Sequence, residues 1–422
     1  MRSLVLIGIL AVLTPAGSAA EKLTVAQLEQ VIAEFASKPH DAPKPRKTLA
    51  PDEISIDLSD GQVLDELDQQ EALLRRIESI ELADRMSTLT LYRLVGKYNL
   101  GPHVQQALEQ LADRSALLKL PPGEQLHQAP PDAAAQLRML AASRLYLVSE
   151  LTHLPNFIAT ETTTRFDNSP VALKYLESMT DATGFHRVDI SKREISFRDG
   201  KEVVDAGQAA PHAGPMSGGL DSRGEFGAEA AVVLSDMEKG TAVFDHWEQT
   251  MGGPAAVFRY AVPRESSHYE VTDECKEQVS FHDTPAYAGE LAVDPKSGAI
   301  LRMTLETESK PGDPVTHVAS VVEYGPVVLG SRRSICPLRS LTFMVEEVNG
   351  CAQRKKKLQK PLAMINQTIF SNYHRFGSSM TLIVDGSNNG HSSSPPSTGK
   401  TPAVPDKGLP AGSEVSGPSR RQ

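Results

Sequence analysis

Hydrophobic and polar residues alternate along residues 287–306, on both sides of a short turn at 294–298. The apolar positions of these two runs are Leu291, Val293, Ile300, Met303 and Leu305. Residues two apart lie on the same face of a β-strand, and Pro295 and Gly298 favour a tight reversal of the chain. The pattern predicts a β-hairpin, which we expect near the middle of one antiparallel sheet in the C-terminal half of the chain.

From residue 23 to about 154, the apolar residues instead recur every three or four positions, the spacing of one face of an α-helix. Thr24, with Gln27 three residues later, resembles a capping box at the start of the first helix. A Pro- and Lys-rich stretch at 37–55 indicates a linker. We expect five helices, at residues 23–35, 63–82, 86–98, 104–120 and 133–151.

Beyond residue 154 the period changes to two, beginning with the Thr-rich stretch at 156–166. One helix is expected in this half, at 225–237, because Phe226, Ala230, Val233 and Leu234 fall on one face. Further strands are expected at 186–197, from about 203, and at 241–249, 256–262, 269–271, 278–282, 317–328, 334–345 and 365–376.

These elements predict an α+β fold in which an N-terminal helical region is followed by a curved antiparallel β-sheet with one covering helix. The expected parts are a leader at 1–20, the helical region at 21–154, the β domain at 155–385 and a tail at 386–422. The tail consists mainly of Ser, Pro, Gly, Asn and Lys, with almost no large apolar residue. Because it cannot bury enough surface to offset the entropy of ordering, we expect it to be disordered.

The N-terminus has the pattern of a secretory signal peptide. Arg2 precedes a short apolar core at 4–13, and small residues at 17–20 allow cleavage after Ala20. A buried N-terminal helix is the alternative. No Cys follows the apolar core, so we expect no lipid anchor there, and we expect no transmembrane segment after cleavage. The sequence therefore predicts an exported protein, either periplasmic or secreted.

The chain of 422 residues is 40% hydrophobic and 23% charged, which is typical of a globular protein large enough for two domains. Its formal net charge of -10 argues against binding to nucleic acid. One basic cluster stands out in an expected loop: Arg354, Lys355, Lys356 and Lys357. This cluster is a candidate contact for anionic lipid headgroups or envelope polymers, and a solvated loop is the alternative.

The three cysteines are Cys275, Cys336 and Cys351. Export permits disulfides, and Cys336 and Cys351 bracket an expected strand and turn, so they are a candidate pair. Closing a loop of about 15 residues contributes roughly 3 kcal/mol in the chain-entropy model. Cys275 would then be a half-buried free thiol. The spacing of the cysteines is not that of a zinc site.

The chain contains no HExxH, GxSxG, P-loop or CxxC motif. His246 and Trp247, the only Trp, are candidate pocket residues, with a plain sheet-face position as the alternative. His282 and Asp283 could form a metal pair or an ordinary loop. The sequence therefore predicts a protein that is not an enzyme and holds no metal or cofactor.

Several short motifs carry a resemblance to known proteins. They are Leu154-Pro155-Asn156-Phe157, Gly224-Glu225-Phe226, Gly289-Glu290-Leu291, Val293-Asp294-Pro295 with Gly298, and Phe370-Ser371-Asn372-Tyr373 before Phe376-Gly377. Together they resemble a family of uncharacterised exported bacterial proteins, over about residues 154–385. More distantly, the hairpin at 287–306 is similar to that of periplasmic lipoprotein carriers. That resemblance implies a half-open, barrel-like sheet that holds acyl chains under its covering helix, although the carriers lack the region at 21–154.

We therefore expect an exported envelope protein whose sheet binds a lipid, a lipoprotein or another apolar ligand. The candidate residues, which line either a cleft or the core, are Leu291, Val293, Ile300, Met303 and Trp247. One alternative is an interaction scaffold whose helices dock a protein partner, and another is a hydrolase with scattered site residues. An open apolar cavity in the sheet favours the carrier, whereas a filled core with an exposed apolar patch on the helices favours the scaffold.

Overall fold

The computed structural model describes residues 21–36, 61–169, 185–198, 201–203, 220, 224–275, 278–347 and 361–376. The expected leader at 1–20 and the expected tail at 386–422 lie outside these residues. The described residues form six α-helices and a ten-stranded antiparallel sheet that is not closed on itself. The predicted α+β class is therefore confirmed.

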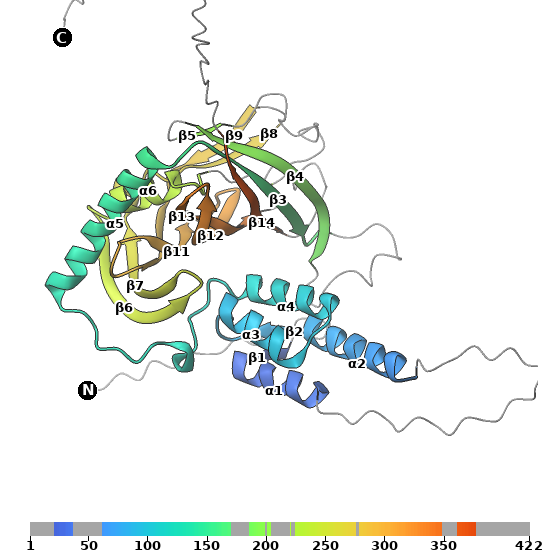
Figure 1. Cartoon of the computed structure of the whole chain (residues 1–422). Coiled ribbons are helices and arrows are strands. Elements are labelled where there is room, and N and C mark those ends of the chain that lie inside the picture. The colour runs from blue at the N-terminus through green and yellow to red at the C-terminus, as the bar shows by residue number, and fades with distance from the viewer. Residues whose placement is uncertain are drawn as a thin grey trace, which may run out of the picture. The chain divides into compact units, whose positions relative to one another are not determined.

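Four helices form the N-terminal region (Figure 1). They are α1 (Val25–Ala36), α2 (Gly61–Glu78), α3 (Thr88–Tyr98) and α4 (Pro102–Arg114). Their apolar faces meet in one core, in which Leu28, Ile32, Leu94 and Leu108 are fully buried. This region thus has a hydrophobic core of its own, separate from that of the sheet.

Two of these helices end earlier than the sequence pattern predicts. The second was expected to reach residue 82, but Ile80–Leu82 forms strand β2, which pairs in parallel with β1 (Glu21–Leu23). The fourth was expected to reach residue 120. It ends at Arg114 because the Ser115 hydroxyl donates to the carbonyl oxygen of Ala112 and accepts the backbone N–H of Met86.

The main sheet has the strand order β5-β4-β3-β14-β13-β12-β11-β10-β7-β6, and all neighbouring strands are antiparallel. The strands are β3 (Phe157–Asp167), β4 (His186–Arg198), β5 (Lys201–Val203), β6 (Thr241–Thr250), β7 (Gly253–Val262), β10 (Ala286–Val293), β11 (Ile300–Glu308), β12 (Val315–Leu329), β13 (Arg332–Glu346) and β14 (Leu362–Arg375). The hairpin predicted at 287–306 is β10–β11, and it lies inside the sheet between β7 and β12.

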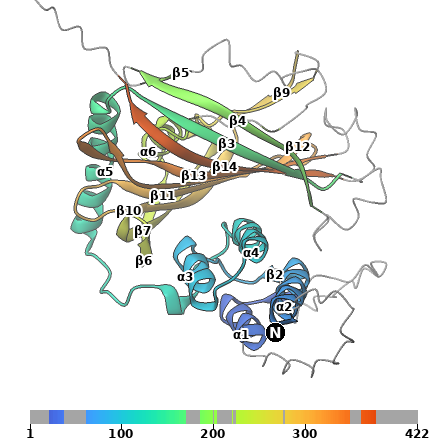
Figure 2. The same cartoon turned by 45° about the vertical axis from the view of Figure 1, so that its right-hand side comes forward.

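The last strand of the sheet pairs with the first. The chain runs outward through β3, β4 and β5, resumes at the opposite edge with β6 and β7, and returns strand by strand to β14 beside β3 (Figure 2). The strands β8 (Val271–Cys275) and β9 (Gln278–Asp283) form a separate hairpin, although their alternation suggested membership of the main sheet.

Helix α6 (Ala228–Asp236) packs on one face of the sheet. Its Ala230, Val233 and Leu234 join a core with the inward residues of β7, β10, β11 and β12. Asp236 accepts a hydrogen bond of 2.8 Å from the buried Tyr287 hydroxyl, which fixes the end of the helix on β10. This helix corresponds to the one predicted at 225–237, but it begins later, at Ala228, and ends at Asp236.

Helix α5 (Ala133–His153) lies across one end of the strands (Figures 1 and 2). The Asp132 carboxylate caps it by accepting the N–H of Ala135 at 2.7 Å. The β10–β11 turn approaches it so closely that a Cβ at Gly298 would lie 2.5 Å from the backbone carbonyl carbon of Ala142. Glu150 also pairs with Arg332, at the start of β13. Both contacts hold α5 against the ends of the hairpins.

We expect Gly298→Ala to destabilise the protein by more than its backbone conformation alone explains. Gly298 has φ of +80°, where an L-residue costs roughly 1–2 kcal/mol, and the added Cβ also meets the α5 backbone. Gly312→Ala is the matched control, because Gly312 has φ of +91° but nothing within 4 Å of its Cβ position. Urea unfolding should show a loss at least about 1 kcal/mol larger for Gly298→Ala. If the two substitutions lowered the free energy of unfolding equally, α5 would be able to move away from the added Cβ without loss of stability.

Candidate functional site

A row of paired residues crosses the sheet on the face turned away from α6. In register across the strands these residues are His246, Val257, Ala292, Arg302, Glu323, Arg339 and Ile369. The strand neighbours Met303 and Val322 belong to the core beneath α6, so the row faces the other side. Arg302, Glu323 and Arg339 thereby form adjacent positive, negative and positive charges on that face.

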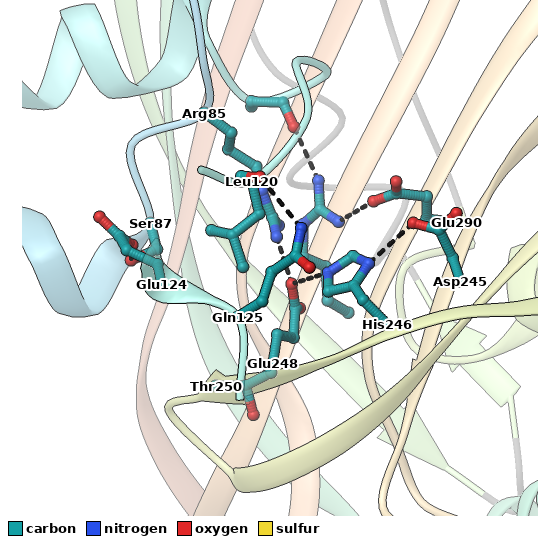
Figure 3. Close-up of polar contacts among 12 residues, drawn as sticks. Arg85, Ser87, Leu120, Glu124, Gln125, Asp245, His246, Glu248, Thr250 and Glu290 are labelled. Carbon is teal, nitrogen blue, oxygen red and sulfur yellow. Dashed lines mark hydrogen bonds and ion pairs between the residues drawn. The ribbon is translucent and has the colours of Figure 1, made fainter. Parts of the chain in front are cut away.

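The helical region contacts this charged face through Arg85, which follows β2. The Arg85 guanidinium donates a hydrogen bond to Oε2 of Glu248 on β6, and both side chains are almost completely buried (Figure 3). The backbone of Gln125 forms a bridge to that of Glu248, which brings the loop before α5 to the same place. This buried ion pair joins residues 163 positions apart in the chain.

Three further polar contacts join the helical region to the sheet. The Thr88 hydroxyl donates to Glu323 at 2.8 Å, and Arg302 donates to the backbone oxygen of Ala116 at 2.7 Å. Asp113, in the last turn of α4, forms an ion pair with Arg339. Arg302, Glu323 and Arg339 therefore each have a partner from the helical region.

His246 lies between two carboxylates (Figure 3). Its Nδ1 is 2.8 Å from Asp245 Oδ2, and its Nε2 is 3.4 Å from Glu248 Oε2. A bulge between Phe244 and His246 turns the ring toward the charged face. Arg259 in turn donates to Asp245. The network thus runs continuously from Arg259 to Arg85.

Burial and charge act in opposite directions on these groups. Burial alone raises the pKa of Glu248, but the Arg85 charge, the His246 hydrogen bond and Arg302 lower it to about 2. Burial lowers the pKa of His246, but hydrogen bonds from its ring to Glu248 and Asp245 raise it overall. The pKa of Arg85 is raised, because Glu248 and Glu290 outweigh the effect of burial. The ionised forms of all three groups are therefore favoured together.

A cavity of about 170 Å³ lies between the helical region and this face of the sheet. Its charged lining residues are Arg85, Glu248, Arg302, Glu323 and Arg339. Its larger apolar and aromatic lining residues are Met86, Leu89, Tyr92, Met251, Leu301, Leu338 and Ile369. Of these, Tyr92, Met251 and Ile369 are 51%, 46% and 41% exposed, so they mark the mouth. The cavity has a charged floor and an apolar rim.

Both ring nitrogens of His246 are engaged by neighbouring side chains. Each contacts a carboxylate, so neither faces a hydroxyl or thiol that it could activate. Within the described residues, His, Cys, Asp and Glu form no group of three or more placed to hold a metal ion. The groups that line the cavity provide charge, hydrogen bonding and apolar contact.

The residues that the sequence singled out for an apolar cleft lie in the packed core beneath α6. Leu291, Val293 and Met303 are at most 1% exposed, while Ile300 and Trp247 are 5% and 8% exposed. Ile300 also lines a second cavity of about 40 Å³, between α5, α6 and the sheet. That volume holds one or a few water molecules and is too small for an acyl chain.

The outer face of α5 carries an apolar stripe, formed by Leu137, Ala141, Leu145 and Val148. Its spacing of four, four and three residues keeps these positions on one side of the helix. Leu137 and Leu145 are 70% and 73% exposed, whereas Met139, Leu140 and Leu147 on the other side pack against the sheet core. We call the four exposed positions the α5 stripe.

The other candidate residues are placed as follows. Cys336 is buried and forms no disulfide with a described residue. Cys351, its expected disulfide partner, lies outside the described residues, so the pairing stays a prediction. The basic cluster Arg354 to Lys357 also lies outside them. Among the described helices, none is both long and apolar enough to cross a bilayer. Asp283 was considered with His282 as a possible metal pair. In the structure the Asp283 carboxylate forms an ion pair with Arg264.

Comparisons of the chain with models of known protein families, with curated proteins and with solved structures find no match. The geometry of the chain itself therefore carries the functional argument.

Arg85 and Glu248 were not singled out from the sequence, although their neighbours His246 and Trp247 were. One signal was available: on a strand, Glu248 falls on the same face as His246, two residues away. The matching Arg85 could not be found in this way, because its position in a loop has no periodicity and its partner lies 163 residues away.

We expect Glu248→Gln to destabilise the protein by about 3–5 kcal/mol at pH 7, since it leaves the Arg85 charge buried without a counter-charge. The carboxyl pKa falls from 4.5 to about 2 on folding, so its contribution exists above pH 4.5 and is lost as the pH falls toward 2. Urea unfolding from pH 2 to 7 should therefore show the two proteins converging at the acid end.

Glu71→Gln is the matched control, because Glu71 pairs with Arg75 on the solvent-exposed side of α2. Its loss should stay below about 1 kcal/mol at every pH. If Glu248→Gln cost no more than Glu71→Gln at pH 7, the buried pair would not be what stabilises the contact between the helical region and the sheet.

Proposed function

We propose that this protein is an exported envelope protein that acts without catalysis, as an interaction scaffold whose α5 stripe docks a protein partner. One observation carries the proposal: the residues expected to line a cleft pack into a core with α6, while an apolar stripe on α5 faces outward. Large exposed apolar side chains grouped on one surface are typical of interaction sites.

The lipid-carrier hypothesis has less support. The sheet is open at both edges and α6 lies on one face, which agrees with the half-open barrel implied by the resemblance to lipoprotein carriers. A carrier, however, needs empty volume beneath that helix. The residues proposed for the cleft pack against one another there, beside a cavity of only about 40 Å³.

The charges around the α5 stripe disfavour a second copy of the chain as the partner. Between residues 133 and 149 the helix carries Arg138 and Arg144 but no carboxylate, and Arg144 is engaged by Leu234 and Glu238. A second copy would therefore bring the exposed Arg138 a like charge and no counter-charge. Like charges in apposition weaken an interface, so a different partner is favoured.

The partner that suits the α5 stripe is an amphipathic helix with an apolar stripe of its own and acidic residues at its flanks. An apolar helix face that packs on another helix uses residues three and four positions apart, as on α5. Arg138 is exposed beside Leu137 and Ala141, so it is available to an acidic side chain of the partner.

The test is site-specific cross-linking in the native host, with a photo-reactive amino acid at position 145. We expect one discrete heterologous adduct, which mass spectrometry maps to an amphipathic, acid-flanked helix of the partner. Leu137→Glu should abolish the adduct, because it places a charge within the stripe. Leu137 lies one helical turn before Ala141 and two turns before position 145. Val328→Glu is the control for surface charge: Val328 is 63% exposed on β12, and its substitution should leave the adduct unchanged.

Three outcomes would contradict the proposal. The first is an adduct with a second copy, and the second is an adduct with another segment of the same chain. The third is an adduct that survives Leu137→Glu, because the partner would then not lie on the stripe.

We also expect the protein purified from its host to carry no lipid. Native mass spectrometry should give the mass of the chain alone, and a fluorescent fatty acid should not be taken up. The physical reason is that the cavity of about 40 Å³ beside α6 is far below the volume of an acyl chain. A co-purifying lipid mass, removed by mild delipidation, would favour the carrier instead.

A further inference from the structure

The larger cavity, of about 170 Å³, is separate from the α5 stripe, since no residue of α5 lines it. It is close in volume to an engineered cavity of about 150 Å³ that takes up benzene. It therefore has room for one compact molecule of that size. The half-exposed Tyr92, Met251 and Ile369 at its mouth leave a way in.

Two hydrogen-bond donors in the lining of this cavity lack partners. The Nε atoms of Arg85 and Arg339 are buried from solvent and donate no hydrogen bond to the residues that the structure describes. Leaving such a donor unsatisfied is unfavourable, so the cavity favours an occupant that brings an acceptor oxygen. Arg85 is only 4% exposed, which makes its Nε inaccessible to bulk water.

Two carboxylates in the lining already accept hydrogen bonds from the protein. Glu248 accepts from Arg85, and the Glu323 carboxylate accepts from the Thr88 hydroxyl. An occupant with donors alone would therefore compete for these groups, whereas an acceptor oxygen would meet free donors.

The charges are balanced within the protein. Arg85 pairs with Glu248, Arg302 with Glu290 and Arg339 with Asp113. A bound anion would add an unbalanced negative charge to a site that excludes water, beside Glu248 and Glu323. A neutral acceptor avoids this cost.

We propose that this cavity binds a compact, uncharged, apolar molecule that carries one carbonyl oxygen. The oxygen accepts a hydrogen bond from the Arg339 Nε–H group, and the apolar body packs against Leu89, Leu301 and the rim residue Met251.

The test uses the full exported chain and three ring compounds of similar size: acetophenone, ethylbenzene and benzoate. The first has a neutral carbonyl oxygen, the second has no acceptor, and the third is an anion. In ligand-observed NMR titrations we expect acetophenone to bind at least about fivefold more tightly than either of the others, since one satisfied buried donor is worth about that factor.

Two variants locate the binding. Met251→Trp fills the mouth at a half-exposed position and should abolish binding of acetophenone, whereas Val328→Trp, at an exposed position outside the cavity lining, should leave it unchanged. Arg339→Lys keeps the positive charge opposite Asp113 but removes the Nε donor. It should weaken acetophenone binding about fivefold without changing that of ethylbenzene.

Tighter binding of benzoate would overturn the proposal in favour of an anion site. Equal binding of acetophenone and ethylbenzene would mean that the arginine donors do not select the ligand. No binding of any compound at millimolar concentration would mean that the cavity holds only water. Thermal melts of each variant check that the fold is intact, so that loss of binding is not loss of structure.

Discussion

The alternation of side chains along the strands is the constraint on which the rest of this structure depends. Because consecutive residues face opposite sides, β11 directs Met303 and Leu305 to the core beneath α6, and Arg302 to the opposite face. A shift of one residue would put a guanidinium into the apolar core and a methionine against the helical region. The apolar packing of one face therefore fixes the register of the charges on the other.

The two faces make different kinds of contact. Beneath α6 the contact is apolar and filled, so its strength depends on volume and fit. On the other face, the helical region brings a core of its own and meets the sheet through ion pairs such as Arg85–Glu248 and Asp113–Arg339. Apolar contact is also present, where Ala116 and Leu117 pack against Val321 and Leu341. Charge pairing is directional, which explains how a cavity persists between surfaces that simple apolar packing would have closed.

The sequence predicted the elements well and the tertiary contacts poorly. The β10–β11 hairpin, the strands around it and α6 followed from periodicity, because each is defined by residues close together in the chain. The predicted end of α2 was wrong. Ile80 and Leu82 fit the apolar spacing of a helix, but they also fit the short strand that pairs with β1. The β8–β9 hairpin alternates like its neighbours but lies outside the main sheet. Contacts such as Arg85–Glu248 depend on distant residues and on a bulge at His246, which no local pattern encodes.

The pairing of β14 with β3 has a consequence for synthesis. Thr163 and Thr368 share a hydrogen bond across these strands although 205 residues separate them. Whether the chain emerges from a ribosome or from an export channel, the strands β3, β4 and β5 of the main sheet appear first, and the whole remainder of the sheet must follow before the edge of β3 finds its neighbour. Throughout that interval a long strand edge is open to any other chain, which is a recognised route to aggregation. The emerging chain should therefore depend on a chaperone that shields β3 until β14, which ends at Arg375, has emerged.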